Sequence, residues 1–190
     1  MDNKKERKVA ESLIYSDDYV QLFFSEKAFK KMIFLVMACS KEVGWHGFVR
    51  KLGKGIYYVD DIILYPQETT AATIRCDTAQ YGLWQQNICI ENPELFEMMR
   101  LHGHSHVNMA CRPSSVDIDL QDDGIEMIQE NGFYIYMIFN KKADRYIKIA
   151  DREDGVIYED VALTFDDKCL SELVDDYRSL VRKEERYGHK

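Results

Sequence analysis

The spacing of hydrophobic positions changes along the chain from helix-like to strand-like several times. Apolar residues at three- and four-residue intervals predict a helix over 26–40, with Ser25 as its N-cap. Two strands should follow this helix. The first begins near Glu42 and runs through Val49, and the second covers 56–65 after a glycine-containing turn. We expect these two strands to pair as a hairpin.

The second half of the chain repeats the same alternation of helix and strand. A helix is expected over 116–130 with Ser115 as its N-cap, and another over 79–88. The almost wholly apolar run Phe133–Phe139 is typical of a strand buried at the centre of a sheet. An amphipathic pattern over 167–186 predicts a final helix. Further short strands are expected within 10–23 and over 70–76, 98–103, 146–149 and 156–164.

Helices and strands therefore interleave without the strict repeat of a parallel α/β fold. The sequence predicts a single domain of the mixed α/β or α+β class, built on a central mixed sheet. No repeat or low-complexity linker divides it. We expect an N-terminal tail with one or two short strands over 1–24, a main domain over 25–165 and a helix packed on it over 166–190.

Composition and charge narrow the class of function. The chain has 190 residues, 46% of them hydrophobic, and a formal net charge of −8, which argues against a nucleic-acid-binding protein. Its longest apolar run, 32–39, is too short to span a bilayer, and the charged start predicts no secretory signal. The five cysteines are scattered and form no metal or disulfide pattern. These features predict a cytoplasmic protein with reduced thiols.

Three of the five histidines lie within residues 102–106. In an extended chain, residues i and i+2 point to the same side, so His104 and His106 could present both imidazoles to one point. Asp117 falls in the first turn of the expected helix over 116–130 and is the natural third ligand. Two histidines and one carboxylate are a common ligand set of catalytic zinc, which also needs a further carboxylate to transfer protons.

The full spacing is more specific than a pair of histidines. His104-Ser105-His106 is followed after seven residues by Ser114 and after two more by Asp117. This pattern resembles the motif of the JAMM metalloproteases, also called the MPN or JAB domain family. That family also has a glutamate upstream, at the start of a strand after a long helix, and the Glu42-Val43-Gly44 segment is similar. The resemblance covers roughly 25–165.

The resemblance implies a fold and a role for each matching residue. The fold would be a curved mixed β-sheet flanked by helices. His104, His106 and Asp117 would hold one Zn²⁺, Glu42 would act as general acid and base, and Ser114 would stabilise the oxyanion. The sequence departs from the family after the second histidine, where the usual proline is replaced by valine.

The implied activity is hydrolysis of an amide or isopeptide bond in a protein or peptide. The substrate would be the C-terminus of a ubiquitin-like protein or of a small carrier protein. A cell-wall or phage-structural peptide is the alternative substrate. A third reading is a non-catalytic MPN scaffold, although such members typically lack one or more of the ligands that this chain retains.

Three further residues are candidates to line the cleft or support the ligands. His46 could face the metal pocket, lie at the surface or orient a ligand, and His102 shares a strand face with His104. Ser105 lies between the two expected ligands. The region 68–97, which includes Tyr81 and Trp84, could be a substrate surface or a packed helix, and we favour packing.

Overall fold

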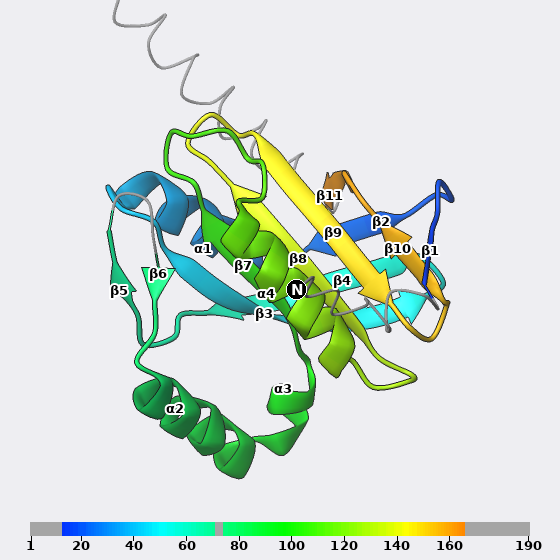
Figure 1. Cartoon of the computed structure of the whole chain (residues 1–190), viewed down its shortest axis with the longest axis horizontal. Helices are drawn as coiled ribbons and strands as arrows, with labels where there is room; N and C mark the ends of the chain where they lie inside the picture. Colours follow the sequence, from blue (N-terminus) through cyan, green and yellow to red (C-terminus); the bar gives the residue numbers. More distant parts are fainter. Residues whose placement is uncertain (1–12, 71–73, 166–190) are drawn as a thin grey trace, which may run out of the picture.

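A computed structural model describes residues 13–70 and 74–165 of the chain. Its main feature is a nine-stranded mixed sheet in the order β1-β10-β9-β8-β7-β3-β4-β2-β11, so β7 is the central strand (Figure 1). In chain order, the strands are β1 (Ile14–Tyr15), β2 (Gln21–Phe24), β3 (Gly44–Gly53), β4 (Ile56–Ile63), β7 (Met99–Ser105), β8 (Phe133–Phe139), β9 (Arg145–Asp151), β10 (Val156–Tyr158) and β11 (Leu163–Phe165).

The described residues hold four helices and a small second sheet. The helices are α1 (Glu26–Ala38), α2 (Thr78–Glu91), α3 (Pro93–Glu97) and α4 (Ser115–Met127). The second sheet pairs β5 (Glu68–Thr69) with β6 (Ile74–Arg75). Figure 1 shows α2 and α3 at one end of the molecule, connected to the main sheet through β7. In the described part of the chain, no helix is both long and apolar enough to cross a membrane.

Alternate residues of β8 pack on opposite sides of the sheet. Ile135 and Met137 belong to the large core cluster that includes Met32 of α1. Tyr136, between them, packs in a smaller cluster with Ile125 of α4. Because successive side chains of a strand point to opposite faces, α1 and α4 cover opposite faces of the sheet.

The same alternation places the histidines of β7. Leu101 is fully buried in the large cluster on the α1 side. His102 is paired in register with Tyr136, and His104 lies two residues further along β7. The two histidines therefore lie on the α4 face of the sheet, near its centre.

The sheet is strongly curled. Register shifts interrupt the pairing of β3 with both of its neighbours, and such bulges increase twist and bending. The curl brings β9 against β3 and β4, although two strands separate β9 from β3 in the sheet order. Tyr57 of β4 donates a hydrogen bond of 2.5 Å to Asp151 of β9, and Lys51 of β3 forms an ion pair of 2.9 Å with the same carboxylate.

Several sequence predictions are confirmed. The first long helix is α1, and its N-cap is Ser25, whose hydroxyl accepts a hydrogen bond from the Ala28 amide at 3.0 Å. The strands predicted after it pair as an antiparallel hairpin, β3 with β4, although β3 begins at Gly44, two residues after Glu42. The mixed α+β class and the central buried strand β8 are also confirmed.

Other predictions are wrong in detail. The N-cap of α4 is Ser114, not Ser115. The strand predicted over 156–164 is two strands, β10 and β11. In the sheet order β10 is second, next to the edge strand β1, and β11 is the opposite edge, because the chain turns between them at Asp160, which has a left-handed φ of 53°. Within the strand predicted over 70–76, only Ile74–Arg75 is a described strand, in the small sheet.

The ends of the chain fall outside the described residues. These include the first part of the predicted tail over 1–24, and the C-terminal helix predicted over 167–186.

Candidate metal centre

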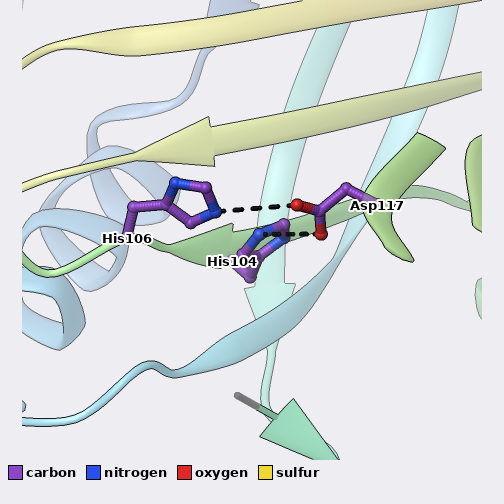
Figure 2. Close-up of side chains that lie close together, drawn as sticks. All are labelled: His104, His106 and Asp117. Atoms are coloured by element: carbon purple, nitrogen blue, oxygen red, sulfur yellow. Dashed lines mark ion pairs between the residues drawn. The ribbon is translucent and has the colours of Figure 1, made fainter. Parts of the chain in front are cut away.

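Three side chains converge where β7 ends. His104 is the second-last residue of β7, His106 follows the strand directly, and Asp117 lies in the first turn of α4. His104 Nε2 lies 3.3 Å from Asp117 Oδ1, and His106 Nε2 lies 3.7 Å from Asp117 Oδ2. One possible ligand atom from each residue lies within 4.8 Å of the other two, so the three residues could hold a metal ion. Figure 2 shows both imidazoles turned toward the carboxylate.

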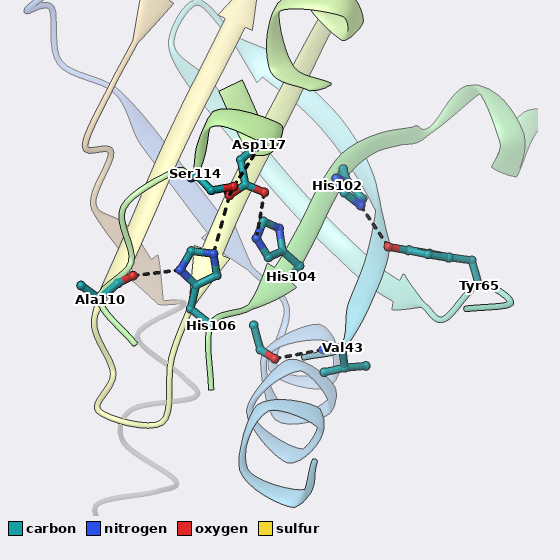
Figure 3. A network of polar contacts seen from close by, with 9 residues as sticks. Val43, Tyr65, His102, His104, His106, Ala110, Ser114 and Asp117 are labelled. Carbon is teal, nitrogen blue, oxygen red and sulfur yellow. Dashed lines mark hydrogen bonds and ion pairs between the residues drawn. The ribbon is translucent and has the colours of Figure 1, made fainter. Parts of the chain in front are cut away.

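The orientation of the His106 ring suits metal binding. Its Nδ1 lies 2.8 Å from the Ala110 carbonyl oxygen, a hydrogen bond that only a protonated Nδ1 can donate (Figure 3). This hydrogen bond leaves Nε2 as the nitrogen that faces Asp117 and can coordinate an ion. Histidine ligands of metals commonly donate their other ring N–H in this way.

Asp117 is fixed by the end of its own helix. The backbone N–H and the hydroxyl of Ser114 both donate to Asp117 Oδ2 at 2.7 Å, and the Ser114 hydroxyl accepts from the Asp117 amide at 3.3 Å. These contacts form a capping box at the start of α4. In this arrangement Ser114 orients a metal ligand, whereas its expected contact with an oxyanion remains a prediction.

Burial and hydrogen bonds shift the pKa of all three residues. Burial lowers the pKa of His104 to about 4, so this imidazole is neutral near pH 7. Hydrogen bonding to Asp117 raises the pKa of His106 above its usual value. Burial alone would raise the pKa of Asp117, but hydrogen bonds with His106 and Ser114 hold it well below its usual range. The site therefore contains a carboxylate that stays ionised and would attract a cation.

Glu42 is a buried carboxyl group beside this site. It is 6% exposed, and burial raises its pKa, while the charge of His106 opposes that shift and the charge of Asp117 adds to it. Ser105 fixes the position of Val43, the residue after Glu42. The Ser105 hydroxyl accepts a hydrogen bond from the Val43 amide at 3.1 Å, and the Ser105 amide donates to the Val43 carbonyl at 2.9 Å. The segment that carries Glu42 is thus tied to the strand that carries the histidines.

His46 and His102 lie in an aromatic cluster on the same face, outside the group of three. Their rings are 5.3 Å apart. His46 Nδ1 donates to the Leu101 carbonyl at 3.2 Å, so its Nε2 accepts from the Tyr81 hydroxyl at 2.7 Å. His102 Nε2 lies 3.1 Å from the Tyr65 hydroxyl (Figure 3). His46 is buried, which excludes the surface position that was one of its alternatives.

The region 68–97 is partly packed and partly exposed. Tyr81 and Trp84 of α2 stack on each other, and their ring centroids lie 6.0 and 5.8 Å from that of His46, as the packing interpretation expects. The other side of α2 exposes apolar side chains, among them Leu83, which is 60% exposed. A role for that side in substrate binding is an untested prediction.

Comparison with known proteins gives no identification. No protein-family model matches the chain, and no curated protein matches it. The assignment of a function therefore depends on the geometry of the site and on the spacing of its motif.

Sequence reasoning missed the groups that orient the possible ligand His106 and the neighbouring His46. The Ala110 carbonyl has no mark in the sequence, because every residue carries one. The Tyr81 contact to His46 joins residues 35 positions apart and depends on how α2 is placed against the sheet.

A pocket lies beside the candidate metal centre, and its lining residues come together only when the chain folds. Its lining comes from β7, α4 and β8, with residues His102, His104, Asp117, Leu120, Gln121, Tyr136, Met137 and Ile138.

Proposed function

We propose that this protein is a zinc-dependent metallopeptidase of the JAMM type, which hydrolyses an amide or isopeptide bond. The observation that supports this proposal is the convergence of His104, His106 and Asp117 on one point, with the buried carboxyl of Glu42 beside them. A structural role alone would not require four ionisable groups, from three separate segments, to gather around the end of the central strand β7. Such clusters of shifted pKa values are typical of functional sites.

The donor set fits zinc. Two imidazole nitrogens and one carboxylate oxygen are ligands that zinc accepts in catalytic sites, where a fourth position stays open for water or substrate. A zinc ion bound there would polarise a substrate carbonyl and lower the pKa of water. The hydrogen bonds of His106 to Ala110 and of Asp117 to Ser114 orient the ligands before any ion binds.

The side chains around the ion would divide the remaining work. Glu42 is the proposed general base and acid, which removes a proton from water and delivers it to the leaving amine. Its raised pKa suits both steps, because a group with a pKa nearer to neutrality exchanges protons more readily at that pH. Ser114, at the exposed N-terminus of α4, is the proposed hydrogen-bond donor to the oxyanion. Its hydroxyl has one hydrogen, so it would have to turn from Asp117 Oδ2 to the oxyanion as charge develops, while the Ser114 backbone N–H keeps its bond to Asp117.

The proposed substrate is a protein C-terminus, either that of a ubiquitin-like modifier or that of a small carrier protein. The alternative within the same chemistry is a cell-wall or phage-structural peptide. A non-catalytic MPN scaffold is a further alternative, but such a protein has no need of an intact metal set with a buried carboxyl group.

Metal analysis and one substitution test the proposal. Purified protein should contain about one zinc per chain, and Glu42→Gln should keep the zinc while turnover falls by about 10²- to 10⁴-fold, since a general base is lost. Glu94→Gln, at an exposed position on α3, is the matched control and should leave both unchanged. Turnover is measured on a ubiquitin-like protein with a C-terminal extension and, in parallel, on a muropeptide.

The outcomes separate the alternatives. Cleavage of only the muropeptide would replace the proposed substrate, and full activity of Glu42→Gln would exclude Glu42 as acid and base. Zinc-free protein without turnover would support the scaffold.

A further inference from the structure

The loop that follows His106 is held in place from the β8–β9 turn. The Lys141 amide donates to the Val107 carbonyl at 2.8 Å, and the Asn140 side chain donates to the Met109 carbonyl at 2.8 Å. Further along, the Cys111 thiol donates to the Asp144 carbonyl at 3.1 Å. The loop therefore takes its shape from a hairpin turn that begins about thirty residues later in the chain.

Asn140 is the most completely bonded residue of this turn. It is 1% exposed. Its Oδ1 accepts from the amides of Lys142 and Asp144, both at 2.9 Å, and this half of the side chain builds the turn. Its Nδ2 donates to the Met109 carbonyl at 2.8 Å and to Asp144 Oδ2 at 3.0 Å. These four bonds use both hydrogens and both acceptor sites of the amide.

The contact with Met109 leads directly to a proposed metal ligand. The Met109 carbonyl belongs to the peptide group that precedes Ala110, and the Ala110 carbonyl accepts the His106 Nδ1 hydrogen bond. A change in the position of the Met109 carbonyl would therefore move the acceptor that sets the His106 ring.

The loop needs such external support. Val107 has a φ of 46°, in the left-handed region that a β-branched residue rarely adopts. A strained residue of this kind persists only where surrounding contacts determine the conformation. The proline expected here from the family resemblance has its φ fixed near −65° and could not adopt this turn. Val107 thus adopts a backbone conformation that proline could not adopt, and the hydrogen bond from Lys141 in the β8–β9 turn helps to hold it there.

We propose that Asn140 is a positioning residue of the metal centre. By holding the Met109 carbonyl, it presents the Ala110 carbonyl to His106 Nδ1 and keeps His106 Nε2 directed at the metal position. This inference rests on the metal binding included in the proposed function, but not on any hydrolytic activity. Loss of an outer contact of this type commonly weakens metal binding by about 10- to 100-fold.

Two substitutions separate the two halves of the side chain. Asn140→Asp keeps an oxygen for the turn amides but replaces the donor to the Met109 carbonyl with a second acceptor. Asn140→Ala removes both the oxygen that accepts from the turn amides and the donor to the Met109 carbonyl. Asn108→Asp, at an exposed position in the same loop, adds the same charge and is the matched control.

Zinc dissociation constants are measured by chelator competition, and NMR of the imidazole nitrogens follows the Nδ1 proton of His106. We expect about a tenfold or greater loss of zinc affinity in both Asn140 variants and none in Asn108→Asp. The Nδ1 proton should be protected from exchange in the parent protein and unprotected in both Asn140 variants. Thermal unfolding of the metal-free variants identifies any that do not fold.

The outcomes are distinct. Parent-like zinc affinity in folded Asn140→Asp, or a protected Nδ1 proton in that variant, would overturn the inference. If the parent binds zinc but cleaves no substrate, the proposed function fails while the inference stands on affinity and proton exchange. If the parent binds no zinc, the metal centre is wrong, and so is a positioning role for Asn140 in it.

Discussion

At the scale of single residues, the His106 ring can hold a second proton that a metal ion would have to displace. His106 Nδ1 donates to Ala110, so any second proton on this ring lies on Nε2, the nitrogen that faces Asp117. The raised pKa of His106 shows that Asp117 favours this charged form. Metal binding and protonation therefore compete for the same atom.

The competition predicts the pH dependence of zinc affinity. Below the raised pKa of His106, affinity should fall by about tenfold per pH unit as pH decreases, because one proton must leave for each ion bound. His104, whose pKa is lowered to about 4, should add a second proton only below that pH. Calorimetry in buffers of different ionisation enthalpy counts the protons released. Affinity that stays constant from pH 8 to pH 5 would contradict this competition.

At the residue scale, the spacing in the sequence was sufficient to predict which possible ligands come together. His104 and Asp117 are 13 positions apart, yet a strand end followed by a loop and a helix N-terminus brings them to 3.3 Å. The groups that hold the ligands were not predictable in this way. The Ala110 carbonyl is backbone, and Asn140 reaches the loop only after β8 has paired with β7.

At the scale of elements, the start of α4 couples helix stability to ligand geometry. Ser114 caps the helix and donates twice to Asp117. Sequence alone could not decide between the adjacent serines, because either of them suits an N-cap.

Ser114→Ala should therefore affect both stability and metal binding. The loss of the cap should cost about 1 kcal/mol of unfolding free energy, measured by urea denaturation. Zinc affinity should also fall, because Asp117 loses the hydroxyl that orients it. Ser115→Ala is the control and should change unfolding by less than about 0.5 kcal/mol, as is usual for surface positions. Equal effects of the two substitutions would show that the capping assignment is wrong.

Element boundaries were hardest to predict where the backbone turns without glycine or proline. The chain turns at Asp160, with a φ of 53°, and separates β10 from β11. Aspartate adopts this conformation more readily than most residues, but its presence does not require it. By contrast, Ser25 and the helical spacing after it were sufficient to predict α1.

At the scale of the whole molecule, the curled sheet is closed by buried polar contacts. Tyr57 and Lys51 both reach Asp151, which is fully buried. Burial raises the pKa of Tyr57, and its hydrogen bond to Asp151 adds to that shift. Burial alone would lower the pKa of Lys51, but contacts with Asp151, Asp154 and Glu153 raise it, so Lys51 stays charged at neutral pH. These contacts link strands that are not neighbours in the sheet.

Removal of one hydroxyl tests the importance of this link. Tyr57→Phe should lower the unfolding free energy by about 1–3 kcal/mol, because a buried carboxylate loses one of its hydrogen-bond donors. Tyr58→Phe, the next residue on the other face of β4, keeps its ring near Arg50 and should have little effect. Chemical denaturation measures both, and zinc affinity should stay unchanged in each. Stability equal to the parent in Tyr57→Phe would show that the hydroxyl contributes nothing to closure.

Both outer ladders of the sheet also join the early part of the chain to the late part. Ile14 of β1 pairs with Val156 of β10, and Leu22 of β2 pairs with Leu163 of β11. During translation, neither ladder can form until residues 156–165 have left the ribosome. Folding that depends on such distant pairs is slow, and unpaired strand edges invite aggregation in the meantime. The nascent chain should therefore depend on chaperones until β10 and β11 are available to pair.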